Sequence, residues 1–271
     1  ADIFDDLGAI ERQFHHLVRT VPGSGAVIRP ARDEALQRVI DRGCWSQDIH
    51  LGTDCGWQIQ AKSADWSSFE LVDPDGRSAQ VQWSMLGAHN ARNAMAAAAA
   101  ARHVGVPVEQ AAASLGRFEG VRRRLETRGR IGQVTVYDDF AHHPTAVATT
   151  LEGVRERHPD QRIFALFEPR SATSCRKVFQ QPYTEAFDAA DRVWIAANAR
   201  AAELPEAERF LPEDLVAGLR LRGVEAEFGP DVETIVREVA QSVRPGDLVV
   251  VMSNGAFGGI HERLIEAINA R

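Results

Sequence analysis

The sequence predicts an α/β protein whose C-terminal half is a doubly wound, mostly parallel sheet. The first observation is an alternation: after about Leu125, five short apolar runs are each followed by a segment with helical spacing of apolar residues. The second is that polar residues gather where these apolar runs end. With 44% hydrophobic and 25% charged residues, the composition is that of a folded globular chain. A sheet built this way is Rossmann-like, with ligands expected at the carboxyl ends of its strands.

The N-terminal half predicts a smaller α/β arrangement that begins with a helix. Apolar residues recur at helical spacing from Ile3 to Val18, with aspartates near the start, where the helix dipole favours negative charge. Seven of the eight positions from Ala94 to Ala101 are alanine, and a helix this thin is expected to be buried against a sheet. The expected helices are 3–18, 33–40, 91–104 and 108–115; the expected strands are 26–28, 57–61, 68–72 and 79–85, with a hairpin turn at 73–76.

The C-terminal half predicts five strand–helix pairs. The expected strands are 134–138, 163–167, 193–197, 226–228 and 248–252, and the helices that follow them are 145–157, 177–190, 213–222, 232–242 and 260–270. The change of pattern places a domain boundary within 122–129, which gives a first domain of residues 1–124 and a second of residues 125–271.

Charge and cysteine usage exclude several classes of protein. A net charge of -7 gives no basic surface for nucleic acid or an anionic membrane, and the longest apolar run, 94–101, is too short to span a bilayer. Three cysteines without a C-x-x-C motif favour free thiols in a reducing cytoplasm, although Cys44 and Cys55 are left open as a pair. The two lysines, Lys62 and Lys177, do not follow glycine, so the chain contains no phosphate-binding P-loop.

The ends of the expected parallel strands carry the candidate ligand-binding residues. These are Asp138, Asp139, His142 and His143 after the first strand; Glu168, Arg170 and Ser171 after the second; Asn198 and Arg200 after the third; and Ser253, Asn254 and Gly255 after the last. Each group has a structural alternative. The Asp-Asp-Phe-Ala-His-His-Pro turn could cap the next helix, and Arg170 could pair with Glu168 at the surface. A metal site at His142 and His143 is not expected, because no third ligand has matching spacing.

Two further groups lie outside these strand ends. Asn90 and Asn93 are one helical turn apart, and their amides match the edge of an adenine, with a helix cap as the alternative for Asn90. Arg122, Arg123 and Arg124 are either a solvated charge run or phosphate ligands.

Three motifs, in this order, resemble the Mur ligase family of ATP-dependent amide ligases. They are Gly87-x-His89-Asn90-x-x-Asn93-Ala94, Gly120-Val121-Arg122-Arg123-Arg124-Leu125-Glu126 and Asp138-Asp139-Phe140-Ala141-His142-His143-Pro144. Each motif alone is weak, but the ordered set is specific, and the resemblance covers essentially the whole chain. The stretches 2–7, 13–18, 168–171 and 252–261 resemble the branch that joins UDP-N-acetylmuramate to the murein tripeptide L-alanyl-γ-D-glutamyl-meso-diaminopimelate in peptidoglycan recycling.

The resemblance implies a division of the chain and a reaction. Residues 1–124 are expected to be the C-terminal part of the family's central ATPase-type α/β domain, and residues 125–271 its complete third domain. The full enzyme is expected to use ATP and Mg²⁺ to convert the muramate carboxylate to an acyl phosphate, which the peptide amine then attacks. The phosphate loop and the magnesium ligands are expected in an N-terminal part that is missing here, so the chain alone is expected to be inactive.

The resemblance also implies roles for individual residues. His89, Asn90 and Asn93 are expected to hold adenine, Arg124 the ATP phosphates and Asp139 the ribose. His142, Arg170, Ser171, Ser253 and Asn254 are expected to line the site of the incoming peptide, with His142 and Asp139 as the catalytic pair. Phe140 stands where the alanine-adding relative has Tyr, so that hydrogen bond is not carried over.

Three other functions are left open by the sequence. The chain could be part of a UDP-N-acetylmuramate–L-alanine ligase, since that relative shares the Asp-Asp-x-x-His-His-Pro motif. It could be a non-catalytic module that binds a muropeptide or nucleotide, which the missing P-loop favours and the ATP-side motifs oppose. A Rossmann-like oxidoreductase is weakened because residues 134–144 contain no glycine at the first strand–helix turn.

Overall fold

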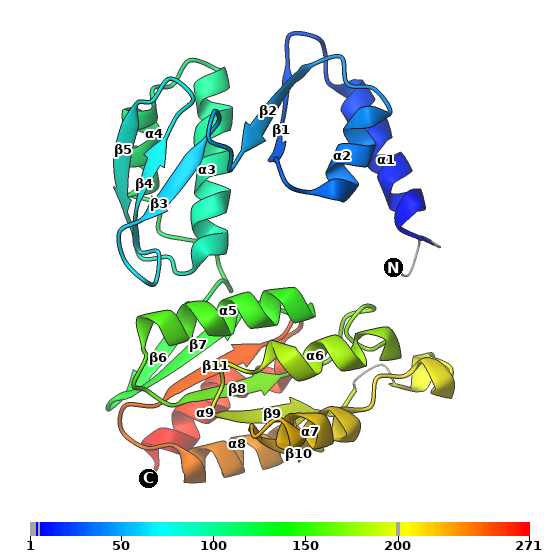
Figure 1. Ribbon diagram of the computed structural model, residues 1–271. Coiled ribbons are helices and arrows are strands. Elements are labelled where there is room, and N and C mark those ends of the chain that lie inside the picture. Colours follow the sequence, from blue (N-terminus) through cyan, green and yellow to red (C-terminus); the bar gives the residue numbers. More distant parts are fainter. Residues whose placement is uncertain (1–3, 5, 199–200) are drawn as a thin grey trace. The chain divides into compact units, whose positions relative to one another are not determined.

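The computed structural model describes residues 4, 6–198 and 201–271, which form two compact units, 1–120 and 121–271 (Figure 1). The first predicted helix falls partly on residues outside the described ones, as does Arg200 of the predicted site. Within the described part of the chain, no helix is both long and apolar enough to cross a membrane.

The first unit contains two small sheets and four helices among its described residues. The sheets are a parallel pair, β1 (Ala26–Pro30) with β2 (Gln47–Leu51), and an antiparallel meander of β3 (Gln58–Ala61), β4 (Ser68–Val72) and β5 (Ser78–Gln82). The helices are α1 (Leu7–Thr20), α2 (Glu34–Asp41), α3 (Ala88–His103) and α4 (Val108–Leu115). Strand β2 was not among the strands expected, because its sequence Gln-Asp-Ile-His-Leu carries few apolar residues.

The alanine-rich helix is buried as predicted. Ala91, Ala94, Ala98 and Ala99 of α3 are each 3% exposed or less, and they pack in one core with Phe69 and Leu71 of β4. The predicted hairpin turn is also confirmed. The Asp73 side chain accepts hydrogen bonds from the backbone N–H groups of Asp75 and Arg77, which fixes the turn between β4 and β5.

The second unit is a six-stranded sheet in the order β10-β9-β8-β11-β7-β6. Its strands are β6 (Glu126–Ile131), β7 (Val134–Asp139), β8 (Ile163–Phe167), β9 (Arg192–Ala196), β10 (Glu225–Gly229) and β11 (Leu248–Met252). Its α-helices are α5 (Pro144–Arg157), α6 (Gln180–Ala186), α7 (Pro212–Leu221), α8 (Val232–Ser242) and α9 (Ile260–Asn269). The predicted helix 177–190 is shorter than expected, since residues 177–179 form a 3₁₀ turn before α6.

Helices cover both faces of this sheet, as the doubly wound prediction requires (Figure 1). Helices α5, α6 and α7 pack on one face, and α8 and α9 on the other. The chain returns from β10 to insert β11 between β8 and β7, so these three strands end side by side.

Strand β6 is antiparallel to β7 and was not predicted. Its sequence Glu-Thr-Arg-Gly-Arg-Ile has no run of apolar residues, and its register shifts between Thr127 and Gly129. An edge strand needs only one face to pack and tolerates such a bulge, so its sequence carries a weak signal.

Candidate functional site

The carboxyl ends of β7, β8 and β11 meet, as the sequence predicted. The backbone N–H of Ser253 donates to the Asp139 carbonyl at 3.1 Å, and the N–H of Glu168 donates to the Met252 carbonyl at 3.1 Å. The predicted residues on the loops after these three strands are therefore neighbours at one edge of the sheet.

His142 lies on the loop after β7 with its ring oriented by the backbone. Its Nδ1 is 2.9 Å from the Phe140 carbonyl, and the two rings of Phe140 and His142 meet edge to face. A carbonyl can only accept, so Nδ1 carries the proton and Nε2 of the neutral ring has a free lone pair. The loop is also held from α6, because the Tyr183 hydroxyl donates to the His142 carbonyl at 2.7 Å.

The turn after β7 caps the next helix, α5, as one of the two alternatives for this motif proposed, and the capping residue is His143. Its Nδ1 accepts from the Thr145 N–H at 3.3 Å at the start of α5, with Pro144 in the first turn. Burial, and then the neighbouring His142, lower the pKa of the His143 imidazole. The turn therefore caps the helix through His143, while His142 is left for other contacts.

The Asp139 side chain is buried and holds the backbone around it. Its carboxylate accepts from the N–H groups of Ala141 and Leu125, each at 2.8 Å, and from the Thr150 hydroxyl at 3.3 Å. Burial raises the pKa of Asp139, and these hydrogen bonds oppose the rise. The arrangement fixes the segment before β6 against the loop after β7.

The loop after β11 is fixed through Ser253. Its hydroxyl donates to the Glu168 carboxylate and accepts from the Gly255 N–H at 2.8 Å. Ser253 is 1% exposed and Glu168 is 8% exposed, so this contact lies inside the protein. The alternative of a surface pair between Arg170 and Glu168 is wrong, because Glu168 is buried and bonds Ser253 instead.

Arg170 is exposed at this edge, and its side chain lies against Gly255. Among the described residues it has no hydrogen bond or ion pair. Ser171 forms a turn with Ser174, whose hydroxyl lies 2.9 Å from that of Ser171. The neighbouring Asn254 has a buried side-chain oxygen, Oδ1, without a hydrogen-bond partner in the part of the chain described. After β9, Asn198 donates to the Phe210 carbonyl at 3.1 Å and so holds its own loop.

Arg123 and Arg124 both lie over the ring of Phe140. Their guanidinium carbons are 5.2 and 5.6 Å from the ring centroid. Arg124 is exposed, but Arg123 reaches inward to the carbonyls of Ser253 and Gly255. Sequence reasoning missed this difference, because three consecutive arginines give no local signal of which one is bound.

In the first unit, the predicted adenine ligands lie at the start of α3. Gly87 is the N-cap residue, with φ of 83°, so Asn90 is not the cap. The Asn90 side-chain amide donates to the Leu86 carbonyl at 2.7 Å, which leaves its Oδ1 and one N–H for another partner. Asn93 is exposed, and His89 is partly buried.

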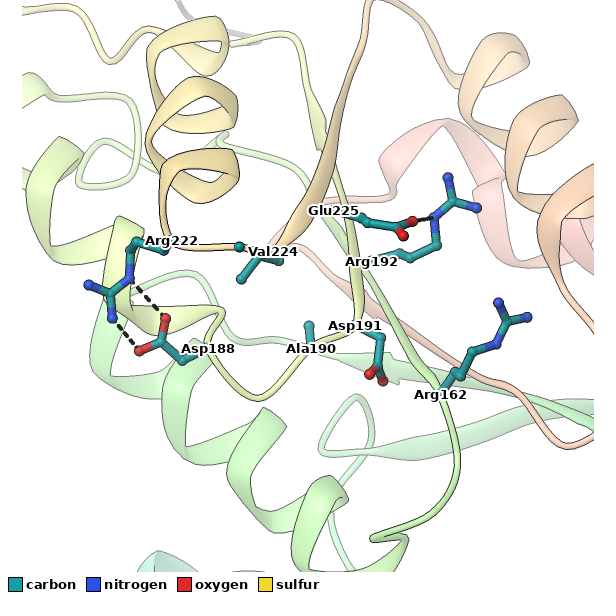
Figure 2. Close-up of a pocket in the computed structure, with 9 residues that line it drawn as sticks. Arg162, Asp188, Ala190, Asp191, Arg192, Arg222, Val224 and Glu225 are labelled. Atoms are coloured by element: carbon teal, nitrogen blue, oxygen red, sulfur yellow. Dashed lines mark hydrogen bonds and ion pairs between the residues drawn. The ribbon is translucent and has the colours of Figure 1, made fainter.

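A polar pocket at the opposite edge of the second unit contains none of the predicted site residues (Figure 2). It is lined by residues at the amino ends of β8, β9 and β10, and its charges are all paired, with Arg162 and Asp191 bonded to Asp247 and Arg155 outside the pocket. Arg222 bonds Asp188, and Arg192 bonds Glu225. Because these cations and anions neutralise each other, the pocket offers no unbalanced charge to a ligand. Within residues 4, 6–198 and 201–271, no three His, Cys, Asp or Glu side chains group as metal ligands.

Known proteins with similar sequences or structures point to one family. Residues 1–101 match the Mur ligase middle domain, and residues 123–255 match the Mur ligase glutamate ligase domain. The UDP-N-acetylmuramate–L-alanyl-γ-D-glutamyl-meso-2,6-diaminoheptandioate ligase of Escherichia coli K12 is 42% identical over 269 residues, which are 99% of this chain and 57% of that protein. The ligase of the same name from Haemophilus influenzae is 38% identical, over 100% of this chain and 58% of its own length.

The fold agrees with these sequence matches. The crystal structure of a murein peptide ligase from Psychrobacter arcticus superposes with a TM-score of 0.72 at 34% identity, over 99% of this chain and 56% of that one. The chain thus spans less than three fifths of the length of these relatives. Two adjacent domain matches cover most of the chain, and a relative that is 42% identical aligns with 99% of it. The chain therefore belongs to the Mur ligase family, with the middle and C-terminal domains of that family.

Proposed function

We propose that this chain is the C-terminal part of an ATP-dependent ligase that joins UDP-N-acetylmuramate to L-alanyl-γ-D-glutamyl-meso-diaminopimelate. Residues 1–124 would complete the central ATP-binding domain, and residues 125–271 would form the domain that receives the peptide. The two relatives whose names state this reaction support the proposal. The ATP that the reaction consumes is available inside the cell, so the proposed location is the cytoplasm.

The exposed guanidinium of Arg170 is the observation that carries the proposal. It projects from the edge where β7, β8 and β11 end, and no acidic side chain among the described residues neutralises it. The tripeptide carries free carboxylates beyond its reacting amine, and a guanidinium can hold a carboxylate through two parallel hydrogen bonds. Ser171 and Asn254 lie on the adjoining loops, and we assign them to the same peptide site.

His142 is the group that we assign to proton transfer. The peptide amine must lose a proton to form the amide, and the Nε2 lone pair of His142 can accept it. Asp139 and Ser253 support this site from within, since their side chains are engaged by the loops themselves. From the sequence, Asp139 was expected to contact the ribose and to act with His142, and Ser253 to line the peptide site. Because both side chains are buried and bonded within the loops, we assign them instead to positioning the two loops.

The residues at the start of α3 fit an adenine. Asn90 and Asn93 each have amide atoms without a hydrogen-bond partner among the described residues, and these can donate to and accept from the base edge, with His89 beside them. ATP supplies the phosphoryl group that activates the muramate carboxylate, and we assign Arg124 to its phosphates. The Mg²⁺ ligands are proposed to lie outside this chain, in the part of the relatives that it does not match.

A comparison of amine substrates tests the proposal. The full-length ligase that contains this chain is assayed for ADP release with UDP-N-acetylmuramate and either the tripeptide or L-alanine. Strong preference for the tripeptide is expected. Turnover with L-alanine alone would instead identify the activity of a UDP-N-acetylmuramate–L-alanine ligase. Tripeptide binding without any turnover would identify a binding module instead.

A further inference from the structure

We propose that Arg123 and Gly255 are positioning residues for Arg170, and that together they set its place in the peptide site. The inference rests on the proposed function, because it explains how the peptide-binding guanidinium is held. Neither residue needs to touch the substrate. Both act through the three-residue loop Ser253–Gly255 that follows β11.

The side chain of Arg123 holds this loop by its backbone. Its Nη2 donates to the carbonyls of Ser253 and Gly255, at 2.6 and 2.7 Å. Its Nε lies 3.3 Å from the buried carboxylate of Asp138, and its guanidinium lies over Phe140. One side chain thus bonds both ends of the loop and is itself held by a charge and an aromatic ring.

The backbone of Arg123 is equally constrained. Its φ of 58° is left-handed, which is unfavourable for a residue with a Cβ. Its N–H donates to the Glu126 carboxylate at 2.9 Å, and its carbonyl accepts from the Phe140 N–H at 2.8 Å. A strained backbone persists where the surroundings fix it, and here the result is that the guanidinium points at the loop after β11.

Gly255 provides the surface against which Arg170 lies. A Cβ at this position would be 2.5 Å from Cδ and 2.7 Å from Nε of Arg170, too close for any real contact. Gly255 does not have a positive φ, so glycine is needed here for space and not for backbone conformation. The clash would fall on the end of a flexible side chain, so a larger residue would displace Arg170 and leave the fold in place.

Arg123 and Arg170 both contact the loop Ser253–Gly255. Arg123 fixes the carbonyls at 253 and 255, and the Ser253 hydroxyl fixes the Gly255 N–H, so the peptide planes around Gly255 have little freedom. Arg170 packs on that rigid surface. Loss of either support should therefore weaken peptide binding. The proposed adenine ligands, Asn90 and Asn93, belong to the other unit and should be unaffected.

Steady-state kinetics of the full-length ligase test the inference. The variants are Arg123→Met, Arg123→Lys, Gly255→Ala, Arg170→Met and the double variant Gly255→Ala/Arg170→Met. Arg237→Met, which changes an exposed arginine on α8, is the matched control. For each protein, the KM for tripeptide, the KM for ATP, kcat and the melting temperature are measured.

We expect Gly255→Ala and Arg123→Met to lower kcat/KM for the tripeptide by about tenfold or more. Gly255→Ala should change the KM for ATP less than about threefold, and it is the variant that separates the two substrates, because Arg123 and the proposed phosphate ligand Arg124 share the Phe140 ring. Arg123→Lys should recover part of the loss, because an ammonium can still reach one carbonyl. On the Arg170→Met background, Gly255→Ala should have almost no further effect, since both act through the same side chain. Arg237→Met should match the parent enzyme.

Three results would overturn the inference. If Gly255→Ala lowers kcat/KM for the tripeptide as much on the Arg170→Met background as in the parent enzyme, Gly255 does not act through Arg170. A strong effect of Arg170→Met without any effect of Gly255→Ala would show that Arg170 binds the peptide without its contact with Gly255. An unchanged peptide KM in Arg170→Met itself would remove the proposed peptide role and the inference with it. Arg123→Met removes the arginine that pairs with the buried Asp138 carboxylate, and this loss could destabilise the fold. If Arg123→Met unfolds, Gly255→Ala remains the decisive variant.

Discussion

The phenol of Tyr183, on α6, donates a hydrogen bond of 2.7 Å to the backbone carbonyl of His142, on the loop after β7. Tyr183 is fully buried among Phe167, Phe187 and Phe210, and burial raises the pKa of its hydroxyl far above the ordinary value. The hydroxyl therefore remains a donor at any working pH. It holds the loop that carries the proposed proton acceptor, His142.

Replacing Tyr183 by Phe tests this support. The ring remains to fill the aromatic cluster, so the change removes only the hydrogen bond and should cost about 0.5–1.5 kcal/mol. For a chain of this size we expect a fall in melting temperature of a few degrees and a lower kcat in the full-length ligase, with the KM for ATP unchanged. Phe187→Leu, which alters the same cluster without touching His142, is the control. Equal kcat in Tyr183→Phe and the parent would show that the bond only stabilises the fold.

Arg170→Ala tests the peptide contact directly. Loss of a charge-assisted bond of about 1.5–3 kcal/mol should lower kcat/KM for the tripeptide roughly tenfold or more. Arg170 is exposed and unpaired among the described residues, so its removal should leave the melting temperature nearly unchanged. The measurements are the rate of the full-length ligase at increasing tripeptide concentration and the melting temperature of each variant. A large loss of stability would instead assign the residue a structural role.

The 271-residue chain alone should neither hydrolyse ATP nor form the amide. It contains no glycine followed by lysine, and phosphoryl transfer depends on the charges that hold the phosphates and the metal. A phosphate-release assay with ATP, UDP-N-acetylmuramate and tripeptide measures this. Sustained turnover by purified chain, free of host ligase, would contradict the expectation.

The sequence predicted the parallel sheet well because each buried strand is a continuous apolar run. Strands β8 and β11 are buried at every position, and such runs bounded by turns are readable without tertiary context. Strand β6 was missed because an edge strand has no such run. Helix α1 begins at Leu7, where the Asp6 side chain accepts from the Ala9 N–H, later than its apolar spacing suggested.

The candidate site was predictable in place but not in its internal contacts. The strand-end rule places His142 and Arg170 at one edge without any knowledge of side chains. Which arginine of three turns inward, and that Glu168 bonds Ser253 and not Arg170, depend on packing between segments far apart in the chain. Such contacts leave no local pattern, so they could be found only in the structure.

His261 should make stability depend on pH in a definite direction. Burial lowers the pKa of His261; Arg128 and Arg123 lower it further, while Asp138 and Glu262 oppose the shift. The folded state therefore resists a proton that the unfolded chain accepts below about pH 6.5. The stabilisation is complete above that pH and is lost as pH falls through the lowered pKa.

Replacing His261 by Gln removes this titration. Between pH 7.5 and 5, the fall in melting temperature should be smaller for His261→Gln than for the parent chain. His16→Gln, at an exposed position of α1, is the control and should follow the parent. Parallel curves for His261→Gln and the parent would show that His261 titrates alike in both states.

The last prediction concerns the two asparagines at the start of α3. If both amides contact adenine, truncating either should raise the KM for ATP and leave the KM for tripeptide unchanged. Losing one such bond and leaving its partner unpaired costs about 1–3 kcal/mol, or roughly 5- to 150-fold in affinity.

The structure separates the two variants in a way that sharpens the test. Asn90 also bonds the Leu86 carbonyl, so Asn90→Ala should lower both ATP affinity and the melting temperature, the latter by the loss of about 0.5–1.5 kcal/mol. Asn93 is exposed and has no such bond among the described residues, so Asn93→Ala should weaken ATP at constant stability. His103→Gln, exposed at the far end of the same helix, is the control. An unchanged KM for ATP in Asn93→Ala, with only a lower melting point in Asn90→Ala, would assign both residues to the helix and not to the nucleotide.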